Sequence, residues 1–272
     1  MNVPPAIALR AVVAALAACA AFAACAEQSA AAAEQVVDVP TRAGVTERLL
    51  LLTTEQPKAT VVLFAGGHGG LQIGGDGKLG WGGGNFLVRS RKLFADEGLM
   101  VAVLDAPSDR QSEPFLNGFR QTPAHVADVQ AVVAWLRQKA AVPVWLVGTS
   151  RGTQSAAFVA TQLTPAQGGP DGLVLTSTIL SDPRGRPVPD MELSRLTIPT
   201  LVVHHKNDGC RLCMYRDLPL LTKKLATTPR KELLSFDGGT SRGDPCEAFA
   251  YHGYNGIERE VVAAIAAWIT AK

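Results

Sequence analysis

The pentapeptide GTSRG occurs twice in this chain, at residues 148–152 and again at residues 239–243. Both copies fit the pattern G-x-S-x-G, in which a serine on a sharp strand-to-helix turn is exposed for nucleophilic attack. The two serines are Ser150 and Ser241. Such a turn needs a buried strand before it and a helix directly after it, so the flanking residues decide which copy could do chemistry.

The flanks favour the first copy. The strand-like run VPVWLV precedes Gly148, and the alanine-rich, helix-like run TQSAAFVATQL follows Gly152. The second copy leads instead into DPCEAF, where Pro245 restricts the residue before it and interrupts a helix. We therefore expect Ser150 to be the nucleophile and Ser241 to lie in a loop.

Strand-like and helix-like segments alternate around this motif. Continuous apolar runs ended by glycine suit strands that are buried on both faces. Strands are expected over residues 45–53, 59–67, 99–107, 142–148, 171–178, 198–205 and 231–239, and helices over 85–97, 123–139, 153–163, 214–226 and 256–270. This alternation predicts one α/β domain with a mostly parallel sheet, helices on both faces and an antiparallel leading strand.

With its serine in this context, the chain resembles the α/β-hydrolase superfamily over roughly residues 45–272. The resemblance implies a triad in the chain order serine, acid, histidine, with the acid after a late strand and the histidine after the last one. Asp208 stands at the usual acid position, and Asp182, after the preceding strand, is the alternative. His252 stands at the position of the base. The other candidate histidines are expected to be structural: His125, His204 and His205.

The resemblance also assigns the donors of an oxyanion hole. The family keeps this loop after its third strand, often as His-Gly-Gly-Gly, whereas this chain has Ala-Gly-Gly-His at residues 65–68. Ala65 then aligns with the usual histidine, which leaves the amide of Gly67 as donor and that of His68 as the next choice. Arg151, directly after the nucleophile, would supply the second amide.

The implied activity is hydrolysis of a small carboxylic ester through an acyl-enzyme, without a cofactor or a metal ion. Thioesters, lactones and amides stay open as substrates, and so does a binding protein that kept this fold without turnover. The connection over residues 179–197 is too short for a large lid domain. A literal G-x-G-x-x-G at residues 75–80 lacks the strand and helix that a dinucleotide site needs, so residues 71–85 are interpreted as a wide mobile loop.

The three cysteines after residue 26 are Cys210, Cys213 and Cys246. Cys210 and Cys213 have metal-like spacing, but no second pair stands nearby to complete a zinc site. A Cys210–Cys246 bridge would join the loops of the candidate acid and base. We hypothesise this bridge, with Cys213–Cys246 and Cys210–Cys213 as alternatives.

The N-terminus is typical of an exported protein. Arg10 precedes an apolar run over residues 11–22, and Ala24-Cys25-Ala26 is a small-x-small cleavage signature. This run is too short to span a bilayer comfortably. The predicted organisation is a signal peptide at 1–26, a flexible leader at 27–44 and the folded domain at 45–272.

Export would lead to the periplasm or to secretion. The segments LAAC and FAAC also resemble bacterial lipoprotein signals, so a lipid anchor at Cys19 or Cys25 stays open.

The composition argues against several other classes of protein. An apolar fraction of 47% and a charged fraction of 18% are typical of a globular chain and not of a disordered one. A formal net charge of +2 gives no reason to expect nucleic acid or an anionic membrane as a partner.

Overall fold

The computed structural model describes Met1 and residues 33–271. Residues 33–271 group into one compact unit. Apart from Met1, the expected signal peptide, with Cys19 and Cys25, lies outside the described residues, as do residues 27–32 of the expected leader.

In the described part of the chain, eight strands form one sheet in the order β1-β2-β4-β3-β5-β6-β7-β8. The strands are β1 (Glu34–Pro40), β2 (Thr46–Leu52), β3 (Thr60–Phe64), β4 (Met100–Pro107), β5 (Val144–Thr149), β6 (Gly172–Thr176), β7 (Thr200–His205) and β8 (Lys231–Phe236). The pairings β1–β2 and β2–β4 are antiparallel, and the other pairings are parallel. The expected mostly parallel sheet with an antiparallel strand at its start is thus confirmed.

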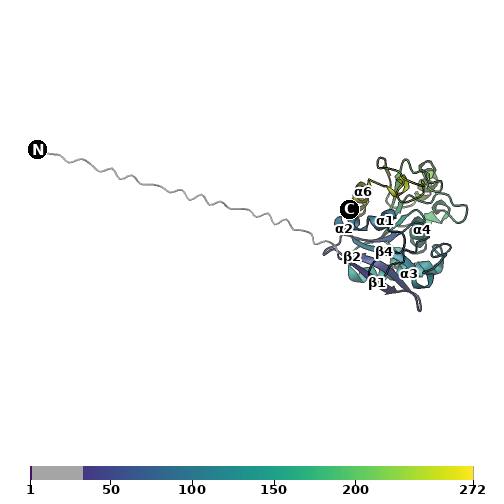
Figure 1. The fold of residues 1–272 in the computed structure, drawn as a ribbon, viewed down its shortest axis with the longest axis horizontal. Coiled ribbons are helices and arrows are strands. Elements are labelled where there is room, and N and C mark those ends of the chain that lie inside the picture. Colours follow the sequence, from purple (N-terminus) through teal and green to yellow (C-terminus); the bar gives the residue numbers. More distant parts are fainter. Residues whose placement is uncertain (2–32, 272) are drawn as a thin grey trace. The chain divides into compact units, whose positions relative to one another are not determined.

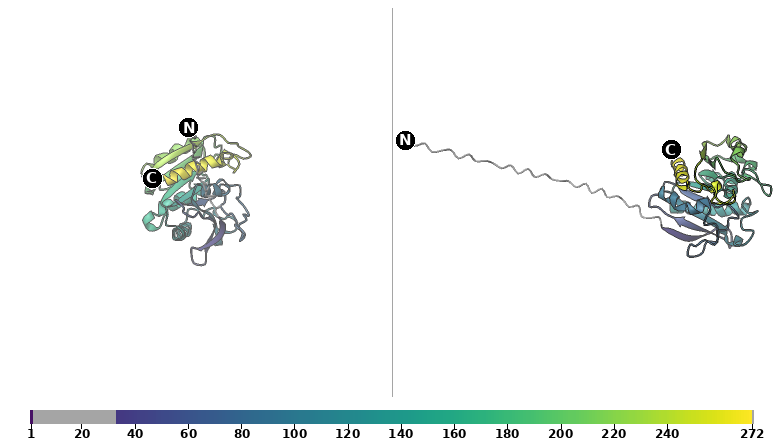
Figure 2. Two further views of the ribbon diagram at one scale, coloured as in Figure 1. Left: turned by 90° about the vertical axis from the view of Figure 1, so that its left-hand side faces the viewer. Right: turned by 45° about the horizontal axis from the view of Figure 1, so that its top comes forward.

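Helices cover both faces of this sheet (Figure 1). They are α1 (Phe86–Arg89), α2 (Arg91–Asp96), α3 (Pro123–Lys139), α4 (Gly152–Gln162), α5 (Leu218–Thr222) and α6 (Glu258–Thr270). Apolar side chains of α3, α4 and α5 pack in one core layer, and those of α1, α2 and α6 pack in the other. Figure 2 shows α6, in yellow, lying across the strands.

The strands alternate between the two layers because successive side chains of a strand point to opposite faces. On β3, Val62 and Phe64 enter the layer of α3 and α4, whereas Val61 and Leu63 enter the layer of α6. All five residues of β3 are buried. A strand with helices on both sides has no solvent face, which explains its continuous apolar sequence.

Three elements differ from the sequence-based expectation. Residues 34–40, assigned to the leader, form β1 instead, because Val37 and Val39 pack against the core of α3. The helix expected over 85–97 divides at Ser90 into α1 and α2. The segment 214–226 is α5 between two short 3-10 turns.

None of the helices in the described part of the chain combines the length and the apolar character that a bilayer crossing requires.

Candidate active site

Ser150 lies on the turn between β5 and α4, in the backbone geometry of a nucleophile elbow. Its φ angle is +51°, a conformation that a non-glycine residue rarely adopts and that costs on the order of 1–3 kcal/mol. The turn is held by its own hydrogen bonds: the Ser150 amide donates to the Thr176 carbonyl at 3.1 Å, and the Thr153 hydroxyl donates to the Ser150 carbonyl at 2.6 Å. The strain is therefore supported by neighbouring elements.

The two glycines of this copy are required by close backbone approach. A Cβ on Gly148 would lie 2.5 Å from the carbonyl oxygen of Gly152, and a Cβ on Gly152 would collide with the carbonyl oxygen of Phe64. Helix α4 starts at Gly152 and so packs directly against the end of β3. No residue with a side chain fits at either position without moving the sheet.

The second copy has a different environment. Ser241 is exposed in the loop between β8 and α6, and the residues around it are tied by the amides of Thr240 and Arg242 to the carbonyls of Asn255 and Phe249. Neither a strand before it nor a helix after it forms a sharp turn there. Ser241 is a loop residue, as expected.

His252 and Asp208 form a buried pair. Asp208 follows β7, and His252 lies in the 3-10 turn Tyr251–Gly253 before α6. The Nδ1 atom of His252 lies 2.8 Å from Oδ2 of Asp208, and the other carboxylate oxygen accepts the Cys210 amide at 2.9 Å. The Nε2 atom of His252 is buried without a hydrogen-bond partner among the described residues.

Ser150 and His252 line the same cavity. Its volume is about 290 Å³, near the lower end of the range of roughly 300–1,000 Å³ that is typical of small-molecule pockets. Its walls also include the glycine loop at Gly67 and the rings of Trp81 and Phe249. Ser150 and His252 therefore border one small cavity.

The loop after β3 approaches the serine closely. A Cβ on Gly66 would lie 3.0 Å from the Cβ of Ser150. Gly67 has a φ angle of +57°, and a Cβ there would collide with the ring of Trp81. The amides of Gly67 and Arg151 donate no hydrogen bond to other described residues. Both expected donors thus have amides without a partner among the described residues.

The side chain of His68 holds this loop in another way. Its ring lies between Trp81 and Phe115, with centroid distances of 3.8 and 4.4 Å. Its Nδ1 atom accepts the Gly70 amide at 3.1 Å. Burial lowers the pKa of His68, so the ring is a neutral packing element at pH 7. The imidazole acts as a spacer between two aromatic walls.

Comparisons with solved structures agree with this architecture. A cold-adapted esterase from an Arctic intertidal metagenomic library is 16% identical with a TM-score of 0.59, and the match covers 90% of this chain and 95% of that one. An esterase of Pyrococcus furiosus is 12% identical with a TM-score of 0.63, over 88% and 91% of the two chains. A Xanthomonas campestris protein described as an α/β serine hydrolase without a lid is 14% identical with a TM-score of 0.53, over 86% and 94%.

This chain has the α/β-hydrolase fold. The sequence itself matches no protein-family model and no curated protein sequence. The fold explains why Ser150, Asp208 and His252 lie at one edge of the sheet, since the carboxyl ends of parallel strands meet there.

Asp182, the alternative acid of the α/β-hydrolase fold, does not meet His252. Its carboxylate accepts from Arg151 at 2.7 Å and from Gln154 at 3.2 Å. Burial opposes its ionisation, but the Arg151 guanidinium and the Arg184 amide outweigh this effect and lower the pKa of Asp182. Asp182 is therefore an ionised partner of Arg151.

Tyr254 supports the histidine turn, a role that the sequence did not reveal. It is fully buried, with a φ angle of +55°, and its hydroxyl donates to the Val203 carbonyl at 2.7 Å. The Ser177 hydroxyl in turn donates to the His252 carbonyl at 2.7 Å. These bonds fix the His252 turn to the ends of β6 and β7.

The glycine-rich segment at 71–85 is anchored, which corrects the expectation of a wide mobile loop. The buried carboxylate of Asp105, at the end of β4, accepts the amides of Leu71, Gln72 and Ile73 at 2.6, 3.1 and 2.8 Å. Ile73 also forms an antiparallel bridge with Leu79. A lone carboxylate at the end of an apolar strand was the sequence signal that could have revealed this anchor.

The expected disulfide between Cys210 and Cys246 is confirmed. It joins the loop of Asp208 to the loop of His252 across a sequence separation of 36 residues. Loop closure of that length stabilises a fold by about 4 kcal/mol in the chain-entropy description. The bridge therefore holds the proposed acid and base loops together.

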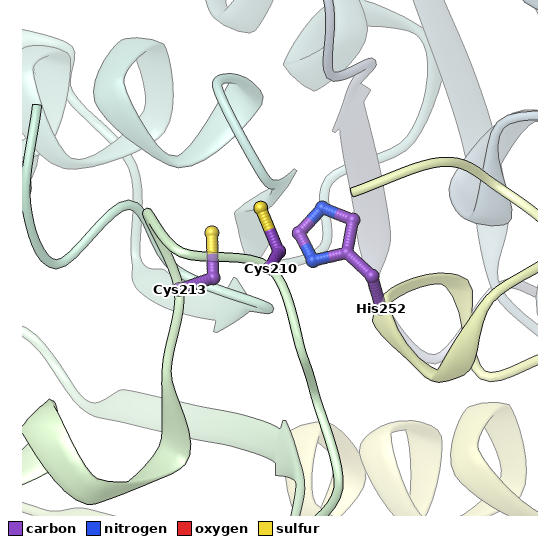
Figure 3. Close-up of side chains that lie close together, drawn as sticks. All are labelled: Cys210, Cys213 and His252. Atoms are coloured by element: carbon purple, nitrogen blue, oxygen red, sulfur yellow. The ribbon is translucent and has the colours of Figure 1, made fainter. Parts of the chain in front are cut away.

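Cys213, the free thiol of the described residues, lies beside Cys210 (Figure 3). The sulfur atoms of Cys210 and Cys213 and a ring nitrogen of His252 lie within 4.8 Å of one another. Because the sulfur of Cys210 is bonded to Cys246, these three atoms are not a free set of metal ligands. Burial raises the pKa of Cys213 well above its ordinary value, so its thiol stays protonated.

The three other histidines are buried away from the Ser150–His252 cavity, and none of them lines it. His204 accepts the Thr178 amide through Nε2 at 2.7 Å, and burial lowers its pKa to about 4. His205 stacks on Tyr251 at 4.6 Å. His125 packs edge-on against Phe64 and Phe119.

Proposed function

We propose that this chain is a serine hydrolase that cleaves small carboxylic esters with Ser150, His252 and Asp208. The observation that carries the proposal is the shared cavity of Ser150 and His252, in which the histidine has one nitrogen bound to a buried carboxylate and the other unpaired. Solved structures with this fold include proteins described as esterases, which supports the same chemistry.

The first half of the reaction forms an acyl-enzyme. The Ser150 hydroxyl attacks the ester carbonyl carbon while Nε2 of His252 accepts the hydroxyl proton. Asp208 keeps the other proton of the ring on Nδ1 and stabilises the imidazolium that forms. The amides of Gly67 and Arg151 donate to the carbonyl oxygen as it becomes negative, and each donor of this kind contributes about 3 kcal/mol.

The tetrahedral intermediate then collapses. The bond to the alcohol oxygen breaks, and His252 returns its proton to the departing alcohol. A water molecule repeats the sequence on the acyl-enzyme, with His252 again taking the proton, and releases the carboxylic acid and free Ser150. The cavity of about 290 Å³ favours short acyl or alkoxy groups.

Labelling with a fluorophosphonate probe and hydrolysis of p-nitrophenyl acetate test this function. Wild type is expected to show both, and Ser150→Ala to lose labelling and to lower kcat by at least about 10³-fold. Ser241→Ala is the matched control, because it changes the serine of the identical pentapeptide outside the cavity. It is expected to retain both activities.

Other outcomes point to other functions. A wild type without labelling or turnover would indicate a binding protein of this fold. Faster turnover of matched thioesters or amides would indicate a thioesterase or a peptidase. Loss of labelling in Ser241→Ala instead of Ser150→Ala would reject the choice of nucleophile.

We propose further that the chain is exported and cleaved after Ala26. The disulfide between Cys210 and Cys246 supports this proposal, because such bonds persist in oxidising compartments. N-terminal sequencing of the mature protein tests it, with Glu27 as the expected first residue. An acylated Cys19 or Cys25 at the N-terminus would indicate the lipoprotein form.

A further inference from the structure

We propose that an arginine-lined pocket beside the Ser150–His252 cavity binds an anionic group, so that the preferred esters carry a carboxylate or a phosphate. This inference rests on the proposed hydrolase function and specifies the substrate class of that site. Four arginines and one aspartate line the pocket, which has a volume of about 600 Å³: Arg120, Arg151, Arg184, Arg186 and Asp182.

The charge of this pocket is concentrated. Four arginines against a single carboxylate leave a formal excess of three positive charges, whereas the whole chain carries a net charge of only +2. A concave surface lined by charge of one sign focuses its field and raises the local concentration of oppositely charged ligands. The pocket therefore selects anions in a way that the surface as a whole does not.

Arg120 is the deepest of these cations and makes no ion pair with a carboxylate of the described residues. It is 5% exposed, and its guanidinium donates to the Ser155 hydroxyl at 2.9 Å and to the carbonyls of Ala65 and Gly67 at 3.2 Å each. Burial, with the nearby cation of Arg151, lowers its pKa to about 9, so it remains charged at pH 7.

Buried charges are normally paired, because desolvation of an unpaired ion is costly. Carbonyl and hydroxyl oxygens satisfy part of the guanidinium of Arg120 but do not neutralise it, and its Nε atom has no partner among the described residues. A ligand anion in the pocket would supply the missing negative charge.

Arg184 and Arg186 are the cations at the rim. Both are exposed on the segment that joins β6 to β7. The Arg184 side chain makes no ion pair with any described residue, and Arg186 donates to Gln121 at 2.7 Å while its guanidinium lies over the ring of Phe158. Arg151, in contrast, is already neutralised by Asp182. The charge free for a ligand is therefore that of Arg120, Arg184 and Arg186.

The arginine pocket and the Ser150–His252 cavity meet at the loop of Gly67. Gly67 lines both the arginine pocket and the Ser150–His252 cavity, and Arg151, whose amide faces the same oxyanion, also lines the pocket. An ester with its carbonyl at these amides can extend one of its two substituents into the arginine pocket. An anionic end on that substituent would lie among the guanidinium groups.

A matched pair of substrates tests the inference. Mono-p-nitrophenyl glutarate carries a terminal carboxylate, and p-nitrophenyl 5-methylhexanoate is its apolar isostere. Wild type is expected to hydrolyse the glutarate with a kcat/KM at least about fivefold higher. Arg184→Glu should lower the ratio of the two kcat/KM values by about fivefold or more, because it replaces an unpaired rim cation by an anion.

Arg216→Glu is the control for net charge, since it makes the same charge change as Arg184→Glu at an exposed arginine that lines neither cavity. It should leave the ratio at its wild-type value. Arg120→Met should lower the ratio more than Arg184→Glu does, provided that circular dichroism shows a folded protein. If Arg120 only braced the loop at Gly67, Arg120→Met would slow both esters equally and leave the ratio unchanged.

Calorimetric titration separates this inference from the hydrolase proposal, because it needs no turnover. Glutarate and inorganic phosphate are the probes. For one or both of them, the Kd for wild type should be lower than the Kd for Arg184→Glu by about fivefold or more. The better probe identifies the preferred anion. If neither probe binds, or if the probes bind wild type and Arg184→Glu with equal affinity, the anionic pocket is rejected, even if neutral esters are hydrolysed. Absence of hydrolysis with Arg184-dependent binding would reject the hydrolase and retain the pocket.

Discussion

Asp208 and Asp182 both follow strands of the sheet, and both carry buried carboxylates, but their partners differ. Asp208 faces His252 at 2.8 Å, whereas Asp182 faces Arg151 at 2.7 Å. A carboxylate can orient an imidazole and stabilise its cation only from hydrogen-bond distance. The two aspartates therefore allow a comparison in which the same chemical change is made beside His252 and beside Arg151.

Asp208→Asn is expected to lower kcat by about 10⁴-fold with little change in KM, because an amide favours the wrong imidazole tautomer. Asp182→Asn is expected to lower kcat by less than about tenfold, since it leaves the histidine pair intact. Steady-state kinetics with p-nitrophenyl acetate measures both. A larger loss in Asp182→Asn would make Asp182 the catalytic acid.

A second prediction at this scale concerns His125, whose ring is buried with neither nitrogen bonded to a described residue. Burial lowers the pKa of His125 to about 3. At pH values between this pKa and the ordinary one near 6.5, His125 binds a proton in the unfolded chain but not in the folded chain. The free energy of unfolding therefore falls as the pH falls through this range. The loss is at most about 1.4 kcal/mol per pH unit.

His125→Leu removes this proton linkage and keeps an apolar contact with Phe64 and Phe119. The difference in unfolding free energy between pH 7 and pH 5 should be smaller in the variant by about 2 kcal/mol. Urea denaturation at the two pH values measures it. An unchanged difference would mean that His125 is protonated in the folded protein.

At the scale of elements, the first GTSRG forms a sharp strand-to-helix turn because three elements converge on it. Helix α4 starts at Gly152 against the end of β3, while β5 delivers Ser150 in a strained conformation. The second GTSRG has no such neighbours, although its sequence is identical. The chemistry of the motif is thus a property of the packing around it.

The final glycines of the two copies provide a matched pair. Gly152→Ala should destabilise the fold by at least about 3 kcal/mol, since the added methyl collides with the carbonyl of Phe64. Gly243→Ala should cost only about 1 kcal/mol, the strain of its φ angle of +73°, because no atom lies within 4 Å of the added methyl. Denaturant unfolding measures both. Similar losses would contradict the packing around the elbow.

At the scale of the whole molecule, strand β1 is the edge of the sheet and belongs to the folded unit. It pairs with β2 from Glu34 to Pro40, and Glu34 forms an ion pair with Arg91 at 2.6 Å. Removing β1 would expose the backbone edge of β2, a template for aggregation.

Two truncations test where the folded unit begins. A chain that starts at residue 31 should keep the Tm of the mature protein, whereas one that starts at residue 42 should lose at least about 10 °C and aggregate more readily. Calorimetry and light scattering measure these effects. If the two truncated chains had equal Tm values, residues 27–44 would be a flexible leader, as the sequence predicted.

Much of this architecture was predictable, for a physical reason. Strands buried on both faces must be apolar throughout, so β3 to β7 are evident as runs of the expected length. The 3-10 turns and the division at Ser90 were not predictable, because local preferences there are weak and tertiary contacts decide them. Strand β1 was missed because a few valines after an alanine-rich segment resemble a linker.

The sequence alone determined the fold class and the order of Ser150, Asp208 and His252, because periodicity and motif context are local properties of the chain. It also allowed the Cys210–Cys246 bridge as one of three pairings. Only the tertiary structure decided which carboxylate meets the histidine and which pairing forms. The arginine pocket was equally invisible, since Arg120 and Arg184 lie far apart along the chain and carry no common motif. Their shared location depends on how the loops after β4 and β6 pack, which no local pattern records.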